Sequence, residues 1–318
     1  MTGPLTIPAP AREKFADPDW TAKGEARATV ALDRLETLWI NTGTLCNIAC
    51  RNCYIFSSPS NDALVYVTVD EITPYLDEIA KRGLGTREIG FTGGEPFMNP
   101  EMVAMADLAL GRGFEVLILT NAMRPMMRPS VQAGLRRLVQ SYGDRLIFRV
   151  SLDHHQAPLH DAERGRRSFE ISIEGMRWLR DIGARMAVAG RTLWGEGDAD
   201  MRAGFAALFR REGFAIDAQD PSALVLFPEM DATVEVPEIT TACWGILDKS
   251  PAEVMCSNAR MVVKRRGADH PVVLACTLLA YSEGFELGRS LVEADRPVPL
   301  NHPHCAKFCV LGGARCSA

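Results

Sequence analysis

Cys46-Asn-Ile-Ala-Cys50-Arg-Asn-Cys53 is the stretch around which the rest of the chain is best understood. Three thiols this close can surround one metal centre without help from other segments. A closed tetrahedral site needs four ligands, so either a fourth comes from a distant residue or one coordination position stays free for chemistry. What the chain builds around these cysteines decides between the two.

Short apolar runs alternate with amphipathic stretches from Leu35 onward, at a repeat of roughly 30 residues, which is the length of a βα unit. The candidate strands are Thr37 to Asn41, Glu88 to Thr92, Glu115 to Thr120, Leu146 to Leu152, Arg185 to Ala189 and Ala223 to Phe227. Six strands separated by helices predict an α/β fold with a parallel sheet and right-handed crossovers.

Helix boundaries are also marked in the sequence. Thr68 and Glu71 have the spacing of a capping box, although Pro74 follows closely and indicates a bent first turn or a start at Asp70. Asn99-Pro100-Glu101 predicts an N-cap, a proline at the first helical position and an acid near the positive helix end. Asp198 is the predicted cap of the last helix in this series.

The composition is that of a globular protein with a full core: 318 residues, 47% hydrophobic, 24% charged and a net charge of −5. The absence of a basic excess disfavours a nucleic-acid partner. No apolar run reaches the roughly 18 residues of a membrane span, and the N-terminus lacks a signal pattern, so we expect a cytoplasmic protein without a membrane partner. Nine cysteines in that compartment favour metal ligands over disulfides.

Composition also predicts a division of the chain. Residues 1–33 are rich in proline and predict a loosely ordered arm. Residues 34–228 contain the six strands. Residues 229–318 have more Asp, Glu and Pro and six of the nine cysteines, so we expect a small cysteine-rich α+β domain that begins near Glu229.

Polar and small residues follow the predicted strands, at the edge where parallel α/β folds bind ligands. Phe91-Thr-Gly-Gly-Glu-Pro96 ends the second strand. Gly93 and Gly94 lack a Cβ and allow the backbone to approach a ligand closely, and Glu95 adds a negative charge suited to an ammonium group. Alone, this motif is more often a turn, but together with the cysteines at βα spacing it indicates a site.

The next strand ends add hydroxyl, amide, carboxylate and imidazole groups. Asn121 follows the third strand, and Ser151-Leu-Asp153-His154-His155 follows the fourth. Arg164 comes soon after and could clamp a carboxylate. Asp153, His154 and His155 are candidate catalytic residues, but each imidazole, like His160, is more often a structural hydrogen-bonding group. Ser151 and Asn121 could equally cap the following helices.

These residues together resemble the radical S-adenosylmethionine (SAM) superfamily over about residues 35–228. Its three-cysteine motif matches Cys46, Cys50 and Cys53, and its Gly-Gly-Glu-Pro motif matches Gly93 to Pro96. The run Ser151-Leu-Asp153, with His160-Asp161, Arg164-Gly165 and Phe169-Glu170, resembles the branch that includes sulfatase-maturing and peptide-modifying members.

The resemblance implies a partial (β/α)6 TIM-like barrel. It implies that the three thiolates hold a four-iron four-sulfur (4Fe–4S) cluster, whose fourth iron is chelated by the amino and carboxylate groups of SAM. It places Gly93, Gly94, Glu95 and Pro96 at the ammonium of SAM, Ser151 and Arg164 at its carboxylate, and Asn121 nearby.

Two positions depart from the pattern of the family. Asn52 replaces the usual aromatic residue before the third cysteine, with Tyr54 just after it, so adenine contacts differ. The stretch from Ser151 to Arg164 is about one residue longer than in similar members, and His154 replaces a common glycine.

A second group of cysteines follows Pro228. The segments 261–264 and 272–275 predict a β-hairpin that brings Cys256 and Cys276 together. The candidate ligands are Cys256, Cys276, Cys305, Cys309 and Cys316. They resemble the SPASM or twitch extensions that hold auxiliary iron-sulfur clusters, and one such cluster fits their number. A zinc ribbon is the alternative, as structural zinc is for the first motif. Cys243 stands apart and predicts a buried small apolar residue.

The resemblance predicts an enzyme that reductively cleaves SAM and uses a 5′-deoxyadenosyl radical to abstract hydrogen from a peptide or protein substrate. An electron donor such as flavodoxin or ferredoxin would serve it. A small metabolite or cofactor precursor is the alternative substrate. A non-catalytic iron-sulfur electron carrier is a third possibility, but a carrier would not need residues 93–96 or Ser151.

Overall fold

A nine-stranded sheet forms the centre of the computed structural model, which describes residues 13–228 and 234–312. Six of its strands pair in parallel in chain order. They are β2 (Thr37–Asn41), β3 (Glu88–Thr92), β4 (Glu115–Thr120), β5 (Leu146–Ser151), β6 (Arg185–Arg191) and β7 (Leu224–Phe227). The predicted parallel sheet is therefore confirmed, with strand ends within two residues of the expected positions.

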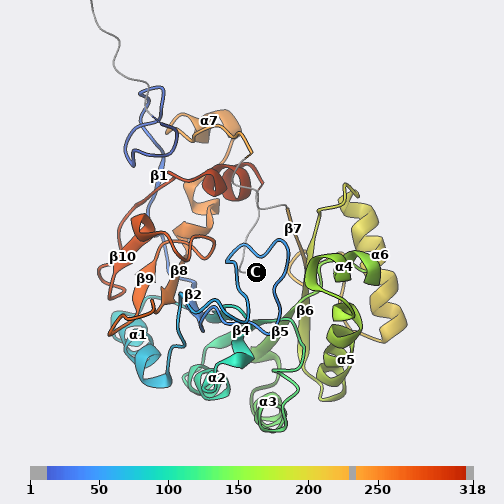
Figure 1. Cartoon of the computed structure of the whole chain (residues 1–318). Helices are drawn as coiled ribbons and strands as arrows, with labels where there is room; N and C mark the ends of the chain where they lie inside the picture. The colour runs from blue at the N-terminus through green and yellow to red at the C-terminus, as the bar shows by residue number, and fades with distance from the viewer. Residues whose placement is uncertain (1–12, 229–233, 313–318) are drawn as a thin grey trace, which may run out of the picture.

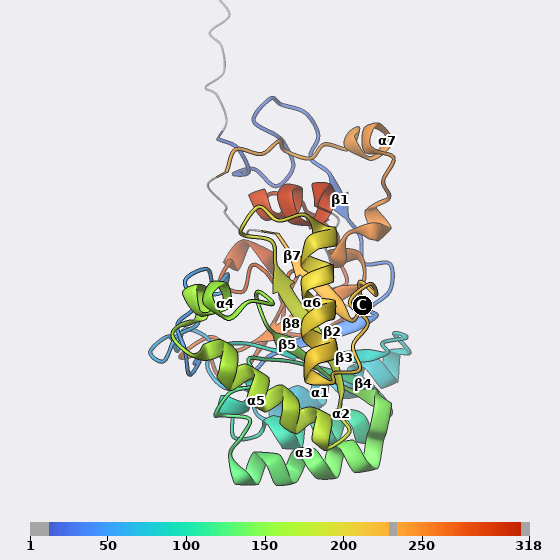
Figure 2. The same cartoon turned by 90° about the vertical axis from the view of Figure 1, so that its right-hand side faces the viewer.

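Helices follow these strands and cover the outside of the curved sheet (Figures 1 and 2). They are α1 (Val69–Arg82), α2 (Met102–Gly111), α3 (Pro129–Tyr142), α4 (Ala157–Arg164), α5 (Ser168–Asp181) and α6 (Asp198–Glu212). The sheet ends at β7 on one side and at β10 (Glu286–Gly288) on the other, without pairing between them in the described residues. The barrel is therefore partial, as predicted.

The cap predictions hold in part. Thr68 and Glu71 form the predicted capping box, with α1 beginning at Val69 and Pro74 inside the helix. The side chain of Asn99 accepts a hydrogen bond from the Glu101 amide at 2.9 Å, but α2 begins only at Met102. Asp198 is the first residue of α6, and the preceding glycine occupies the cap position instead.

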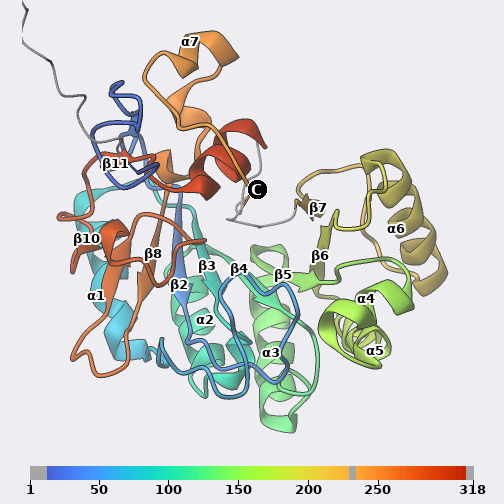
Figure 3. The ribbon, with the colours of Figure 1, turned by 45° about the horizontal axis from the view of Figure 1, so that its top comes forward.

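The C-terminal strands extend the same sheet. β8 (Ala259–Val263) and β9 (Val272–Leu274) form the predicted antiparallel hairpin. β8 also pairs in parallel with β2, the first strand of the barrel (Figure 3). The cysteine-rich part therefore shares hydrogen bonds with the barrel. The boundary predicted near Glu229 lies outside the described residues.

Residues 13–33 are more ordered than the composition of the N-terminal segment predicts. From residue 13 onward it packs beside α7 (Cys243–Leu247) and the C-terminal part (Figures 1 and 2). Arg27 is buried, and its guanidinium pairs with Glu238 at 2.6 Å. β1 (Thr29–Val30) pairs with β11 (Val298–Pro299). These anchors lie more than 200 residues away, so local composition could not reveal them.

Within the described residues, no helix is both long and apolar enough to cross a membrane.

Candidate active site

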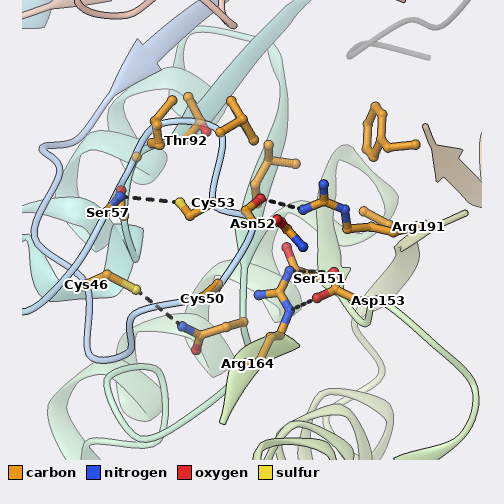
Figure 4. A pocket seen from close by; sticks show the side chains of 18 of the residues that line it. Cys46, Cys50, Asn52, Cys53, Ser57, Thr92, Ser151, Asp153, Arg164 and Arg191 are labelled. Atoms are coloured by element: carbon orange, nitrogen blue, oxygen red, sulfur yellow. Dashed lines mark hydrogen bonds and ion pairs between the residues drawn. The ribbon is translucent and has the colours of Figure 1, made fainter. Parts of the chain in front are cut away.

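The loop after β2 brings the three-cysteine motif to the carboxyl end of the sheet. Its two ends are held together where the Cys46 amide donates to the carbonyl of Ser58 at 3.0 Å. Cys46, Cys50 and Cys53 all line one cavity of about 1250 Å³, a volume that includes its open mouth (Figure 4).

Burial shifts the pKa values of two thiols in this loop. It raises the pKa of Cys46 to about 12 and also raises the pKa of Cys50, although Arg164 opposes the second effect. Thiolates in such a place need a metal centre to stabilise their charge. In the described part of the chain, no three His, Cys, Asp or Glu side chains meet at a position for a single metal ion.

Gly93 and Gly94 hold the loop after β3 against the cysteine loop. A Cβ on Gly93 would lie 2.5 Å from the Gly43 carbonyl, and one on Gly94 would lie 2.3 Å from that of Leu45. Gly93 also has φ +143°, which favours glycine. Both glycines line the cavity. The absence of a Cβ therefore allows contact with the cysteine loop itself, which the sequence interpretation did not foresee.

Glu95 lies behind the cavity and joins β3 to β4. Its carboxylate accepts hydrogen bonds from Thr120 Oγ1 and the Asn121 amide, both at 2.8 Å, and from the Phe97 amide at 3.2 Å. Burial raises its pKa to about 7. Neither Glu95 nor Pro96 is among the residues that line the cavity. Their predicted contact with an ammonium group remains a prediction.

Asn121 lies beside the first cysteine. Its Nδ2 donates to Asn47 Oδ1 at 2.9 Å and lies 3.9 Å from Cys46 Sγ. Its own Oδ1 accepts from the Met123 amide at 3.0 Å. The amide is therefore fixed at the wall of the cavity by the loops after β2 and β4.

Ser151, Asp153 and Arg164 all line the cavity. Arg164 donates from Nε and Nη2 to the two Asp153 oxygens, at 2.7 and 2.8 Å (Figure 4). Burial would raise the pKa of Asp153, but the Arg164 guanidinium outweighs it and holds that pKa below its usual value. The pair fixes a cation beside Cys50.

The histidines do not line the cavity. His154 is fully buried, and because its Nδ1 accepts from the Gln156 amide at 3.0 Å, its Nε2 bears the proton that faces Glu196 at 2.6 Å. His155 stacks on His154 at 4.2 Å. Of the three predicted catalytic residues, the structure therefore brings only Asp153 to the cavity.

His160 lies next to Asp153 but does not itself line the cavity. Its Nδ1 accepts from the Asp153 amide at 3.1 Å, and burial lowers its pKa to about 4. Neutral His160 thus supports the backbone of the residue that holds Arg164.

Several polar residues of the cavity were not predicted as site residues, and three of them are linked by hydrogen bonds: Asn52, Glu163 and Arg191. Asn52 Nδ2 donates to Glu163 Oε2 at 2.7 Å, and the Asn52 carbonyl accepts from Arg191 Nη1 at 2.6 Å. Arg191 ends β6. Its place at the carboxyl end of a parallel strand was the signal that could have identified it.

The Radical SAM superfamily model matches residues 40–203, which is 164 of 318 residues. The chain belongs to this superfamily. The cofactors of this radical SAM chain are accordingly a 4Fe–4S cluster and SAM, and three thiols at one cavity with a free side are a suitable donor set.

The radical SAM chain is similar to several characterised proteins. The subtilosin biosynthesis protein AlbA of Bacillus subtilis is 32% identical over 145 residues, covering 45% of this chain and 30% of AlbA. An AdoMet-dependent heme synthase of Methanosarcina barkeri is 30% identical over 141 residues, covering 42% of this chain and 36% of the heme synthase. The chain thus spans about a third of the length of these curated relatives.

Solved structures share the radical SAM fold. Streptococcus suis SuiB bound to SAM has a TM-score of 0.58 at 11% identity, covering 80% of this chain and 63% of SuiB. SuiB bound to its precursor peptide SuiA has a TM-score of 0.55 at 13% identity, covering 89% of this chain and 67% of SuiB. At identities of 11% and 13%, the similarity to these structures shows a shared fold alone.

In the second group of cysteines, Cys256 precedes β8 and Cys276 follows the antiparallel strand β9. Both lie at the end of the sheet where β2 begins, whereas the first cysteine motif follows the end of β2. Cys256 and Cys305 are buried, and Cys276 is half-buried. Burial raises the pKa of Cys305, and the nearby thiols of Cys276 and Cys256 raise it further, so these three are neighbours. Cys309 is on the same π-helix as Cys305, η6 (Cys305–Leu311). Cys316 lies outside the described residues.

Two further features concern the C-terminal part. Thr277, Leu278 and Phe308 line the cavity of the first motif, and Phe308 stacks on Phe227 with ring centres 5.9 Å apart. The extension therefore forms part of the cavity wall. Cys243 packs against the hydrophobic core, as predicted, but it is only half-buried and accepts a hydrogen bond from the Thr240 amide at 3.4 Å.

Proposed function

We propose that this radical SAM enzyme reductively cleaves SAM at a 4Fe–4S cluster held by Cys46, Cys50 and Cys53, and abstracts hydrogen from a peptide substrate. One observation supports this most directly. The three thiols line a single cavity together with Ser151 and Arg164.

The residues around the thiols have separate tasks in this proposal. Ser151 and Arg164 hold the carboxylate of SAM, and Asp153 positions Arg164 through its two hydrogen bonds. Backbone groups of Gly93 and Gly94 face the ammonium. When bound, the cluster and SAM supply one-electron chemistry that releases methionine and a 5′-deoxyadenosyl radical, which becomes 5′-deoxyadenosine after taking a substrate hydrogen.

Apolar side chains from distant segments restrict water at the other side of the cavity. Trp39, Phe227 and Phe308 line it, the last from the C-terminal extension. Exclusion of water protects a reactive species from side reactions. Residues 234–312 therefore contribute to the reaction chamber as well as to any second metal centre.

A peptide is the substrate class that the similar proteins favour. SuiB has been crystallised with a precursor peptide, and AlbA acts in the biosynthesis of a bacteriocin. The similarity to a heme synthase supports the alternative, a small metabolite or cofactor precursor. We further propose that the cysteines at 256, 276, 305, 309 and 316 hold one auxiliary iron-sulfur cluster, with zinc as the alternative.

Anaerobic incubation of the reconstituted protein with SAM and dithionite tests the proposal. We expect 5′-deoxyadenosine and methionine to form in equal amounts. Iron that is reduced without any cleavage of SAM would instead indicate an electron carrier. Elemental analysis of the protein purified without oxygen distinguishes iron from zinc at the second group of cysteines.

A further inference from the structure

Arg191 is the last residue of β6 and lines the same cavity as the cysteine motif. Its amide donates to the Asp153 carbonyl at 2.9 Å, so its backbone is fixed at the carboxyl end of the sheet. Figure 4 shows Ser151 between the guanidinium groups of Arg191 and Arg164. Arg149 is the third arginine that lines the cavity. Arg164 and Arg191 therefore face the cavity from different positions.

The hydrogen bonds of the two guanidinium groups differ. Arg164 is bound on two nitrogens by the carboxylate of Asp153. Arg191 donates from Nη1 to the Asn52 carbonyl, whereas its buried Nε has no acceptor. Among the described residues, Arg191 forms no ion pair. No carboxylate of the described residues therefore contacts its guanidinium, and at least its Nε–H donor makes no hydrogen bond.

The carboxylates of the cavity are engaged elsewhere. Asp153 is bound by Arg164, and Glu163 accepts from Asn52 Nδ2 at 2.7 Å. Asn52 thus separates Glu163 from Arg191. Leaving a partly buried guanidinium without an anion is costly, and its planar fork matches a carboxylate in two parallel hydrogen bonds.

From this arrangement we infer that Arg191 binds a carboxylate of the substrate. The inference rests on the proposed function, which already assigns Ser151 and Arg164 to the carboxylate of SAM. The substrate therefore bears an acidic group near the reacting position. That group belongs either to a peptide, as an acidic side chain or a free C-terminus, or to a small carboxylic acid. The aromatic wall of Phe227 and Phe308 would contact its apolar part.

Competitive retention by the cluster-loaded full chain tests this inference, with SAM present and no reductant. One pool contains hexapeptides with Asp or Glu and a free C-terminus, and its matched pool contains Asn or Gln and a C-terminal amide. A second pair of pools has succinate, glutarate and benzoate in one pool and their amides in the other. Ultrafiltration and mass spectrometry measure the amount of each compound retained.

We expect the wild-type protein to retain members of one acidic pool at least about 10-fold better than their neutral counterparts, and the retained pool distinguishes peptide from small acid. Arg191→Gln should abolish this preference. Arg191→Lys keeps a donor for the Asn52 carbonyl but lacks the fork, so it should lose several-fold in preference with its iron retained. Arg210→Gln, at an exposed position on α6, is the matched control.

Three results would overturn the inference: no acid retained, acids and amides retained equally, or a preference that survives in Arg191→Gln or is unchanged in Arg191→Lys. Loss of iron with the acid preference intact in the remaining loaded protein would show that Arg191 only braces the cysteine loop. The 5′-deoxyadenosine assay of the wild-type protein without any probe tests the proposed function separately.

Discussion

The two groups of cysteines differ in how the chain brings them together. Cys46, Cys50 and Cys53 come from one loop and line a cavity with charged neighbours such as Arg164. Cys256, Cys276 and Cys305 come from three segments and meet among buried apolar residues. The first group has a free side that faces a ligand cavity, whereas the second lies within the packing of the extension. This difference supports the proposal that SAM binds at the first group and that the second has an auxiliary role.

Replacing Cys46, Cys50 and Cys53 together by alanine should have the largest effect. The variant should lose one cluster and all cleavage of SAM, because no other described thiol lines that cavity. Iron content and 5′-deoxyadenosine formation measure the two losses. Cys243→Ala is the matched control and should leave both unchanged, and unaltered cleavage in the triple variant would contradict the assignment.

Arg260 provides a test of the packing around the second group. It is buried, and its guanidinium donates to the carbonyls of Cys256, Ala259 and Ala294. Arg260→Met should lower the free energy of unfolding by about 3 kcal/mol, because these carbonyls lose their donor. Arg210→Met, at an exposed position, should change it by less than about 0.5 kcal/mol. Denaturant unfolding compares the two, and equal values would show that Arg260 does not stabilise the extension.

Arg164→Ala should weaken SAM binding about 10- to 150-fold, the equivalent of a charged hydrogen bond of roughly 1.5–3 kcal/mol. The iron content should stay the same, because Arg164 is not a ligand. Calorimetric titration with SAM measures the change. Unaltered affinity would mean that the longer stretch between Ser151 and Arg164 has moved this residue out of its predicted role.

Thr68→Ala should have the smallest effect, a loss of about 1 kcal/mol in stability from the capping box of α1. It lies away from both groups of cysteines, so iron content and SAM affinity should not change. A loss of iron in this variant would show that stability alone controls cluster retention, and would weaken the conclusions drawn from the cysteine variants.

Local pattern predicted much of this molecule. The six barrel strands are apolar and mostly buried, so their runs stand out in the sequence. The cysteine motif is contiguous and lies after the first of them. The capping box at Thr68 is likewise local.

Long-range contacts could not be predicted. Arg191 meets Asn52 across 139 residues, and Arg27 meets Glu238 across 211. The pairing of β8 with β2 likewise depends on where the sheet curves. The sequence did not reveal the partners of His154 and His155, namely Glu196 and Phe205. In each case a distant segment supplies the contact.

The pairing of β8 with β2 also determines how the central claim is best tested. Removing all residues after Pro228 would take away β8, one of the two strands that pair with β2, and would disturb the barrel as well as the thiols. A variant with alanine at Cys256, Cys276 and Cys305 keeps the sheet and removes only thiols.

The most direct measurement is the electron paramagnetic resonance spectrum of this reduced variant, recorded with and without SAM and followed by assay of 5′-deoxyadenosine. The account predicts that one cluster remains, that SAM changes its spectrum, and that SAM is still cleaved at the loop containing Cys46, Cys50 and Cys53. A spectrum that SAM does not alter, with no 5′-deoxyadenosine although the iron of one cluster is retained, would contradict it.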